Sequence, residues 1–446
     1  PSRNSRSKIK SFYDSNESYK NRRLKRMSET ITYFPTIEAV EAAAKNLEGV
    51  ANITPLVPNV QYSSKFECNI SFKREDLQVV RSYKIRGAYN KMSSLTPKEA
   101  ASGVVCASAG NHSQGVALSC KLLKIQGTIF MPTTTPKQKI ERAKMFGEHY
   151  IKIILVGDSF DDAYSAAIKD CTERQKTFIH PFNDEKVIEG QATLGLELVH
   201  QTPAPIDYIF VAVGGGGLAS GMSTVFKHLS PTTKIIGVEP EGAPSMKAAF
   251  QNDGVIQLDK IDNFVDGAAV KRVGDLNFAI CQKNLHDMIT IHEGSACQAI
   301  LDLYNKEAII AEPAGALSVA ALETYKEEIK GKNVVCIISG GNNDITRTAE
   351  IKERALLYSN LKHYFIITFP QRAGALREFV VDILGPNDDI THFEYTKKVN
   401  RENGVAVVGI EIKSPSDFEP LIAKMKRHNF YGNYLNEKPD LFQFLV

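Results

Sequence analysis

The sequence lacks tryptophan, and its cysteines follow no recognisable pattern. The seven cysteines are scattered and odd in number, and none forms a CxxC pair, so we expect neither a disulfide framework nor a zinc site. No stretch approaches the roughly 20 apolar residues that a membrane span requires, and no secretory apolar segment is present. These absences indicate a globular protein of a reducing compartment, and we expect the cytoplasm.

Positive charge is concentrated in the first 26 residues. The net charge is +3, but residues 1–26 hold nine basic and two acidic residues, a local balance of +7. The remainder is therefore near −4, and nothing in it indicates binding to nucleic acid. We expect this polar tail to be disordered. Three interpretations remain open: upstream sequence translated from an early start (Met27 looks like a natural start), a targeting peptide, or a functional basic arm.

The 446 residues predict two or three domains. Residues 36–48 have the spacing of a first helix, and from residue 70 short apolar runs alternate with helical patterns. Such alternation is typical of parallel sheets covered by helices. The expected strands are 69–73, 103–107, 126–131, 150–156, 208–213, 234–239 and 333–338.

The C-terminal part has a different order of elements. After a charged, helix-prone connector at 346–361, residues 362–446 predict a β-α-β-β-α-β unit, the ferredoxin-like arrangement. Its strands are expected at 363–369, 390–397 and 404–412 with a short last strand, and its helices at 374–384 and 416–427. There is room for one such unit. A small interaction domain without a ligand is the alternative.

Two distant segments carry the first chemical signals. Lys84 stands near the start of a predicted helix, after Ser82, a residue type that caps helices. Gly214-Gly215-Gly216-Gly217 follows an apolar strand and precedes a helix, a context in which backbone N–H groups can close on a phosphate. An arbitrary lysine in this position would be a surface residue. Together, however, a lysine and a phosphate loop are what pyridoxal phosphate (PLP) requires.

Two further turns follow predicted strands. Ser108-Ala109-Gly110-Asn111-His112 opens a helix after strand 103–107, so its free N–H groups can face an anion, although an ordinary strand–helix turn would look similar. Ser339-Gly340-Gly341 ends the last strand of this region.

These four elements, in this order, resemble the fold-type II PLP enzymes, and most closely the biosynthetic threonine dehydratases (threonine deaminases). The resemblance runs from about residue 30 to the C-terminus. It implies an α/β fold like the tryptophan synthase β chain, with two parallel-sheet domains, followed by an ACT-like regulatory domain of α+β class. The implied boundaries are a catalytic region of 27–345, with a large domain of 27–102 and 183–345 and a small domain of 103–182, and a regulatory domain of 362–446.

The resemblance also implies roles for single residues. Lys84 would form the Schiff base with the cofactor and act as the general base. Asn111 would lie against the cofactor's phenolic oxygen, and Ser339 would face its pyridine nitrogen. Gly214, Gly215, Gly216 and Gly217 would hold its phosphate. The substrate carboxylate would be bound by Ser108, Gly110 and His112.

The implied reaction is the dehydration and deamination of L-threonine to 2-oxobutanoate and ammonia, the first step of isoleucine synthesis. The regulatory domain implies allosteric inhibition by L-isoleucine, with L-valine as an opposing effector, and the expected assembly is a homotetramer. Ala109 stands where serine racemases carry a second serine, which favours dehydration over racemisation. A serine-preferring dehydratase and a catalytically silent amino-acid sensor are the alternatives. Glu239-Pro240 resembles a cation-binding stretch, but the later acidic ligand is missing from 241–245, so we expect no metal.

Overall fold

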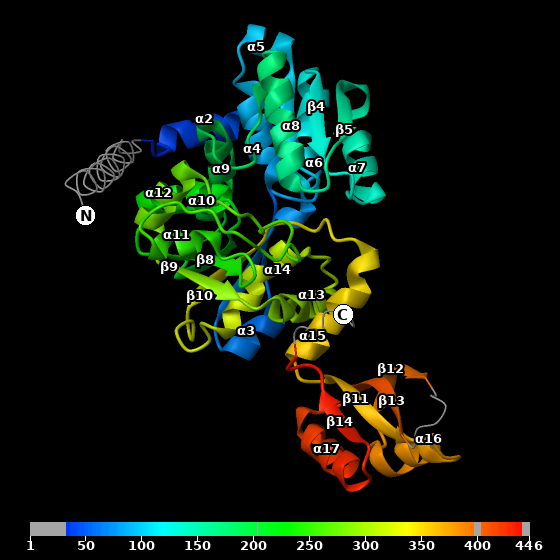
Figure 1. Cartoon of the computed structure of the whole chain (residues 1–446). Helices are drawn as coiled ribbons and strands as arrows, with labels where there is room; N and C mark the ends of the chain where they lie inside the picture. Colours follow the sequence, from blue (N-terminus) through cyan, green and yellow to red (C-terminus); the bar gives the residue numbers. More distant parts are fainter. Residues whose placement is uncertain (1–32, 203, 397–402, 439–446) are drawn as a thin grey trace, which may run out of the picture.

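A computed structural model describes residues 33–202, 204–396 and 403–438 (Figure 1). Three separate sheets organise these residues: one of six strands and two of four. The predicted disordered tail of residues 1–26 lies outside the described residues. Within them, the helices are all too short or too polar to cross a bilayer.

The largest sheet has the order β1-β2-β10-β7-β8-β9. All neighbours run parallel except β1, which pairs antiparallel with β2 at one edge. The last strand in sequence, β10, therefore lies in the middle and joins β2 to β7. The bounds are β1 Leu56–Pro58, β2 Asn69–Arg74, β7 Tyr208–Ala212, β8 Lys234–Pro240, β9 Asp287–Ile291 and β10 Asn333–Ile338.

Both faces of this sheet are buried. Along β7, Tyr208 and Phe210 enter one apolar cluster, whereas Ile209 and Val211 enter another on the opposite face. Because successive side chains of a strand point to opposite faces, a sheet covered by helices on both sides needs such continuous apolar runs. This is the pattern from which the strands were predicted.

The helices from α2 to α15 lie around the six-stranded sheet and a second, four-stranded parallel sheet (Figure 1). The N-terminal helix α2 packs on α9, and α13, α14 and α15 lie together near the opposite end. The α-helix bounds are α2 Ile37–Asn46, α3 Val60–Phe66, α4 Lys84–Ser93, α5 Pro97–Ser102, α6 Asn111–Leu123, α7 Lys137–Gly147, α8 Phe160–Glu173, α9 Glu185–Gln201, α10 Gly217–Leu229, α11 Ser245–Gln251, α12 Asp275–Asn284, α13 Glu293–Glu307, α14 Pro313–Ala320 and α15 Thr348–Tyr358.

A second parallel sheet is built from one continuous stretch of chain. Its order is β5-β4-β3-β6, with bounds β3 Val104–Ala107, β4 Gly127–Met131, β5 Ile151–Leu155 and β6 Thr177–Phe178. Helix α6 of this stretch packs against α4, which follows the large sheet's strand β2. The two sheets are thus connected by direct helix contact as well as by the chain.

The C-terminal unit is an antiparallel sheet of order β12-β13-β11-β14, at one end of the molecule beyond α15 (Figure 1). This is the ferredoxin-like order, so the predicted β-α-β-β-α-β arrangement is confirmed. Its core is aromatic, with Phe365, Phe379 and Phe430 fully buried. The bounds are β11 Lys362–Pro370, α16 Ala375–Glu378, β12 Asp389–Thr396, β13 Asn403–Glu411, α17 Phe418–Arg427 and β14 Tyr431–Tyr434.

All seven strands predicted for the catalytic region are present, with ends displaced by at most about one residue. Three short or edge strands, β1, β6 and β9, were not predicted. The helix predicted at 374–384 continues after α16 as a π-helical segment, Phe379–Ile383, and the connector prediction corresponds to α15.

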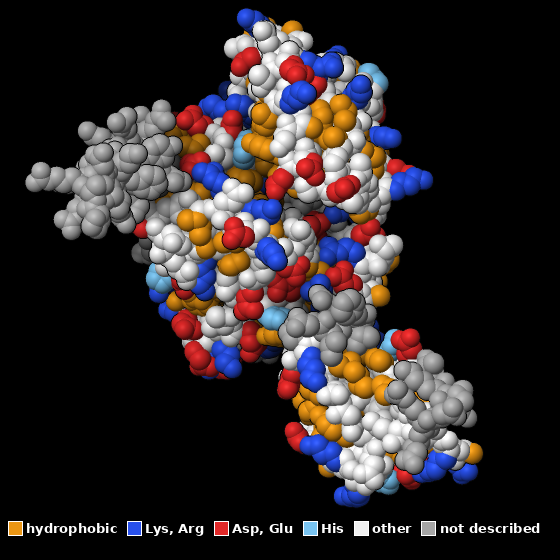
Figure 2. Space-filling model, viewed as in Figure 1, with side chains coloured by type: hydrophobic (Ala, Val, Ile, Leu, Met, Phe, Trp, Pro, Cys, Tyr) orange, Lys and Arg blue, Asp and Glu red, His pale blue; other side chains and the backbone are white. Residues whose placement is uncertain are grey.

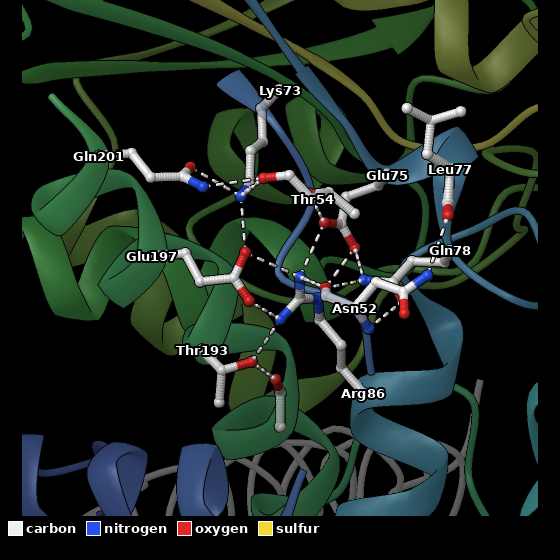
Figure 3. Close-up of polar contacts among 11 residues, drawn as sticks. Asn52, Thr54, Lys73, Glu75, Leu77, Gln78, Arg86, Thr193, Glu197 and Gln201 are labelled. Carbon is white, nitrogen blue, oxygen red and sulfur yellow. Dashed lines mark hydrogen bonds and ion pairs between the residues drawn. The ribbon is translucent and has the colours of Figure 1, made fainter. Parts of the chain in front are cut away.

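A buried network of charges joins helix α4 to the large sheet and to α9 (Figure 3). The Arg86 guanidinium donates twice to Glu75, each bond 2.8 Å long, and twice to Glu197, at 2.6 and 3.0 Å. Lys73 donates to Glu197 (2.6 Å), to Gln201 (2.9 Å) and to a backbone carbonyl (2.7 Å). Two cations thus face two carboxylates with every charge hydrogen-bonded.

The network is deep in the protein, because the side chains of Arg86, Lys73 and Glu75 are 1%, 0% and 0% exposed. Burial opposes the ionisation of Glu75, but Arg86 and Lys73 outweigh it and hold the pKa of this carboxyl below its usual value. Glycines bring the helices close enough for these contacts: a Cβ at Gly190 of α9 would collide with the Arg86 carbonyl of α4. Arg86 lies two residues after Lys84, so the network fixes the helix that carries this lysine.

Replacing Arg86 by methionine should strongly destabilise the protein. Glu75 would lose its guanidinium in a fully buried site, and breaking one partner of a buried pair costs about 3–5 kcal/mol. The midpoint of denaturant unfolding, followed by circular dichroism, measures the loss. Lys137→Met is the control, because Lys137 forms an exposed pair with Glu141 and such pairs contribute about 0–1 kcal/mol. Equal midpoints for the two variants would contradict the role of the network.

Candidate active site

Lys84 is the first residue of α4, and two backbone hydrogen bonds attach the segment before it to the turn after β10. Tyr83 N donates to Ser339 O at 3.2 Å, and Gly341 N donates to Arg81 O at 2.9 Å. The ammonium of Lys84 donates to the carbonyl of Pro181 at 2.9 Å. Residues 84, 181 and 339 are therefore held together although they are distant in sequence.

The predicted helix cap at Ser82 is wrong. The N-cap position is Tyr83, whose side chain makes no capping bond, and Ser82 instead pairs through its backbone with Gly340. The Ser82 hydroxyl is buried and has no hydrogen-bond partner among the described residues. Because Ser82 pairs with Gly340, it does not occupy the N-cap position of α4.

The loop after β3 presents the start of α6. Gly110 is the N-cap, and no side chain caps the helix. Within the described residues, the backbone N–H groups of Asn111 and His112 have no acceptor, which is the state expected for a helix N-terminus that receives an anion. Gly110 N itself is taken, because it donates to Ser108 Oγ at 3.2 Å.

His112 lies in this loop with its side chain turned inward. Its Nε2 lies 2.8 Å from the carbonyl oxygen of Ile179, which can only accept, so this nitrogen carries the proton. Burial lowers the pKa of His112 to about 3. The imidazole is therefore neutral with its Nε2 occupied, and the donor that His112 offers to an anion is its backbone N–H.

The four glycines form the turn between β7 and α10. Within the described residues, none of the N–H groups of Gly214 to Gly217 donates to a protein acceptor. Gly216 has φ +93°, and a Cβ at Gly215 would collide with the ring of Phe182. Because Phe182 follows Pro181, the segment that receives the Lys84 ammonium also packs on the glycine loop. Free donors at a helix N-terminus are suited to a phosphate.

Ser339 follows β10 directly and is nearly buried, at 3% exposed. Its carbonyl is used by Tyr83, while its hydroxyl donates to no protein group within the described residues. The structure thus brings Lys84, the Ser339 turn and the glycine loop together at the carboxyl ends of parallel strands, where ligands bind in open α/β sheets.

Three polar residues that sequence reasoning gave no role lie beside Asn111. Its Nδ2 donates to Glu312 Oε1 at 2.6 Å, and its Oδ1 accepts from Asn342 Nδ2 at 2.7 Å. Arg142 of α7 in turn donates to Asn342. The contact between Glu312 and Asn111 spans 201 residues of the chain, and no spacing rule predicts it.

The electrostatic setting favours a reactive amine at Lys84. Burial lowers the pKa of Lys84 to about 8, while the nearby carboxyl of Glu312 opposes part of this effect. A neutral amine, which a nucleophile or base requires, is thus accessible near physiological pH.

Comparison with known proteins agrees with this geometry. A family model described as "Pyridoxal-phosphate dependent enzyme" matches residues 47–340, and one described as "C-terminal regulatory domain of Threonine dehydratase" matches residues 353–445. A relative from Halalkalibacterium halodurans, "L-threonine dehydratase biosynthetic IlvA", is 53% identical over 410 residues, which cover 92% of this chain and 99% of the relative. Its counterpart in Bacillus subtilis is also 53% identical and is covered to 97%.

This chain belongs to the biosynthetic threonine dehydratase family of pyridoxal-phosphate dependent enzymes. The processed form of threonine deaminase isoform 2 from Solanum lycopersicum superposes with a TM-score of 0.68 at 38% identity, covering 72% of this chain and 95% of that one. Maize serine racemase superposes with a TM-score of 0.67 at 29% identity, covering 73% and 99%. The expected fold class, enzyme class and cofactor are therefore confirmed.

The residues of this family member fit PLP. The cofactor needs an amine, a phosphate site and partners for its ring. Lys84 provides a partly buried amine with a lowered pKa. The glycine turn provides unpaired N–H groups, and it has no room for side chains, because a Cβ at Gly214 would collide with Ala268 and one at Gly215 with Phe182.

The stretch that resembles a cation site has another role here. Both carboxylate oxygens of Glu239 accept backbone N–H groups of α11, from Met246 at 2.6 Å and Lys247 at 2.9 Å. Burial raises the pKa of Glu239 to about 8. The side chain is committed to holding the start of α11.

The capture of PLP by the apoprotein should depend on pH through Lys84. With a pKa of about 8, about a quarter of the Lys84 amines are neutral at pH 7.5, against roughly one in a thousand for an unperturbed lysine. The rate, followed by visible absorbance, should rise with pH through a midpoint near the pKa of about 8 and level off roughly one pH unit above it. Nα-acetyl-lysine, measured in parallel, should keep rising to much higher pH. A protein curve that follows the free amino acid would contradict the lowered pKa.

Proposed function

We propose that this enzyme converts L-threonine to 2-oxobutanoate and ammonia, as the first step of isoleucine synthesis. The observation that carries the proposal is the Lys84 amine on the Pro181 carbonyl, with Tyr83 bonded to the Ser339 carbonyl and Phe182 packed on the glycine loop. The names of relatives at 53% identity and the matching regulatory domain supply the substrate.

In this proposal Lys84 has two tasks. Its neutral amine would hold PLP covalently through the cofactor's aldehyde group. The freed amine then removes the proton from the substrate Cα as general base. The chemistry that PLP would supply at this site is the withdrawal of electrons from the substrate Cα. Ser339 would face the pyridine nitrogen, where a hydroxyl, unlike a carboxylate, leaves that nitrogen unprotonated.

The start of α6 would bind the substrate carboxylate. The unpaired N–H groups of Asn111 and His112 and the helix dipole attract an anion, with Ser108 and Gly110 shaping the turn. Because the His112 imidazole is neutral and bonded to Ile179, it takes no part as a base. Gly214, Gly215, Gly216 and Gly217 would hold the cofactor phosphate, and Asn111 would lie at its phenolic oxygen.

The atoms balance across the reaction. Threonine loses its α-proton to Lys84 and its β-hydroxyl as water, and hydrolysis of the resulting unsaturated amine consumes one water. One threonine therefore gives one 2-oxobutanoate and one ammonia. Serine would react in the same way, because one methyl group contributes only about 1–3 kcal/mol to discrimination. The matching regulatory domain favours the biosynthetic, threonine-using form.

The lobes of the catalytic region would exclude water during elimination. We assign a small domain of residues 103–182 and a large domain of 27–102 and 183–345, which is supported by the continuous sheet β3–β6. Lys139 of α7 forms a 2.5 Å ion pair with Asp266, and Lys271 forms a 3.0 Å pair with Asp161 of α8. These pairs join the two proposed domains and would hold them together over the substrate.

The proposal includes feedback by L-isoleucine, with L-valine as an opposing effector, in a cytoplasmic homotetramer. The C-terminal unit has a hollow of about 290 Å³ beside the β11–α16 turn. Its walls include the apolar Phe369, Leu376 and Phe393, and the cations Arg372 and Arg377. An amino acid with a branched apolar side chain and a carboxylate matches this lining. Hydrophobic side chains are visible on this unit in Figure 2.

Purified protein should release 2-oxobutanoate from L-threonine faster than pyruvate from L-serine, and Lys84→Ala should abolish both. Without the amine, no base remains at Cα, so the loss should exceed a thousandfold while circular dichroism stays unchanged. A coupled assay for 2-oxo acids measures the rates. Retained dehydration by Lys84→Ala would overturn the mechanism, and a preference for serine would favour the catabolic alternative.

Deleting residues 362–446 should leave threonine turnover but remove inhibition by L-isoleucine, because the deletion removes the whole C-terminal sheet. Initial rates with and without isoleucine measure the effect.

A point variant tests the position of the effector. Phe393→Ser removes a wall of the hollow and should raise the isoleucine concentration for half inhibition about tenfold. Val405→Ser is the matched control, because Val405 is also an exposed apolar residue of this sheet but does not line the hollow. Equal isoleucine sensitivity in both variants would place the effector elsewhere.

A further inference from the structure

Glu312 is a buried carboxyl of the site that the proposed mechanism leaves unused. It is 5% exposed and occupies the N-cap position of α14. A side chain at an N-cap commonly accepts from its own helix. Glu312 makes no such bond, and its Oε1 accepts instead from Asn111 Nδ2 at 2.6 Å. The carboxyl is thus directed away from its own helix and towards α6.

This contact fixes the orientation of the Asn111 amide. Oδ1 accepts from Asn342, while Nδ2 donates to Glu312. A flipped amide would place its oxygen against the carboxylate and its N–H groups against the Asn342 donor, so both partners enforce one orientation. An amide nitrogen has two hydrogens. Within the described residues the second N–H of Asn111 has no acceptor, so it is available to a ligand.

The sequence makes room for the carboxyl at a specific position. A Cβ at Gly340 would collide with Glu312 Oε1, and the carbonyl of Gly340 accepts from Glu312 N at 3.1 Å. Gly340 follows Ser339. A glycine is therefore required at position 340, because it leaves space for the Glu312 carboxyl that holds Asn111.

The charge of Glu312 is delicately balanced. Burial and the charge of Asp266 raise the pKa of Glu312, while the Asn111 hydrogen bond, Lys139 and Lys84 lower it, and the net pKa is about 7. Near neutral pH, ionised and protonated forms therefore coexist. Oε1 can accept from Asn111 in both forms, so an uncharged acceptor at this position should preserve the contact.

Building on the proposed function, we propose that Glu312 is a positioning residue that holds the Asn111 amide with one N–H free for the phenolic oxygen of the cofactor. The acceptor oxygen at residue 312, more than its negative charge, carries this role. Loss of the acceptor frees the amide to rotate and weakens both the binding of PLP and the hydrogen bond that sets the colour of the bound cofactor.

The test uses the full chain, stripped of cofactor and titrated with PLP. Glu312→Leu removes the acceptor and should weaken PLP binding about tenfold, because the hydrogen bond that orients the Asn111 amide is lost, and should shift the visible absorption band. Glu312→Gln keeps an acceptor without charge and should bind within about twofold of the wild type, with an unshifted band. Glu293→Gln is the control, since this other buried glutamate accepts from Gly242 N at 2.7 Å outside the site.

Two results would overturn the inference: wild-type affinity and spectrum in Glu312→Leu, or a defect in Glu312→Gln as large as in Glu312→Leu. If Glu312→Leu does not fold, Asn342→Leu replaces it in the test, because this variant removes the other hydrogen bond that orients Asn111. The absorption band of Asn342→Leu should shift in the same direction. An unshifted band in Asn342→Leu would also overturn the inference. Threonine turnover by the wild type distinguishes the proposed function from the proposed role of Glu312. If the wild type is active and the Glu312→Leu spectrum is unchanged, only the role of Glu312 is contradicted.

Discussion

The buried contact of Arg86 with Glu75 and Glu197 is the constraint on which the rest of the catalytic region depends. A buried charge is costly unless it is paired with an opposite charge and hydrogen-bonded. Here the acceptors around Arg86 and Lys73 come from other elements. The end of β2, the start of α4 and the last turns of α9 can therefore take only one mutual arrangement. The same contacts fix the position of the Lys84 backbone, because Lys84 lies two residues before Arg86 on the same helix.

The site itself is made where two sheets meet. The glycine turn and Ser339 follow strands of the large sheet, whereas Asn111 follows a strand of the small one. A chain of polar contacts from Arg142 through Asn342 and Asn111 to Glu312 crosses between them. Because the residues of this chain come from both sheets, the geometry around the amine depends on how the two lobes sit together.

Sequence reasoning found what local patterns encode. Buried parallel strands are apolar throughout, so β7 and β10 were predicted almost to the residue, whereas the short edge strands β1 and β6 were not. The Ser82 cap failed because pairing with Gly340, 258 positions later in the chain, outweighed a local preference. The role of Glu312 was missed for the same reason, since its contact with Asn111 joins residues 201 positions apart in the chain.

The central place of β10 in the large sheet has a consequence for synthesis of the chain. β10 lies between β2 and β7, so as the ribosome makes the protein, β2 has no parallel neighbour until residues 333–338 emerge. The small sheet comes from one continuous stretch and is complete by β6. The small sheet can therefore form early, while the edges of β2 and β7 that later pair with β10 are still exposed. That interval is the time at which the nascent enzyme is most vulnerable to aggregation and most dependent on chaperones.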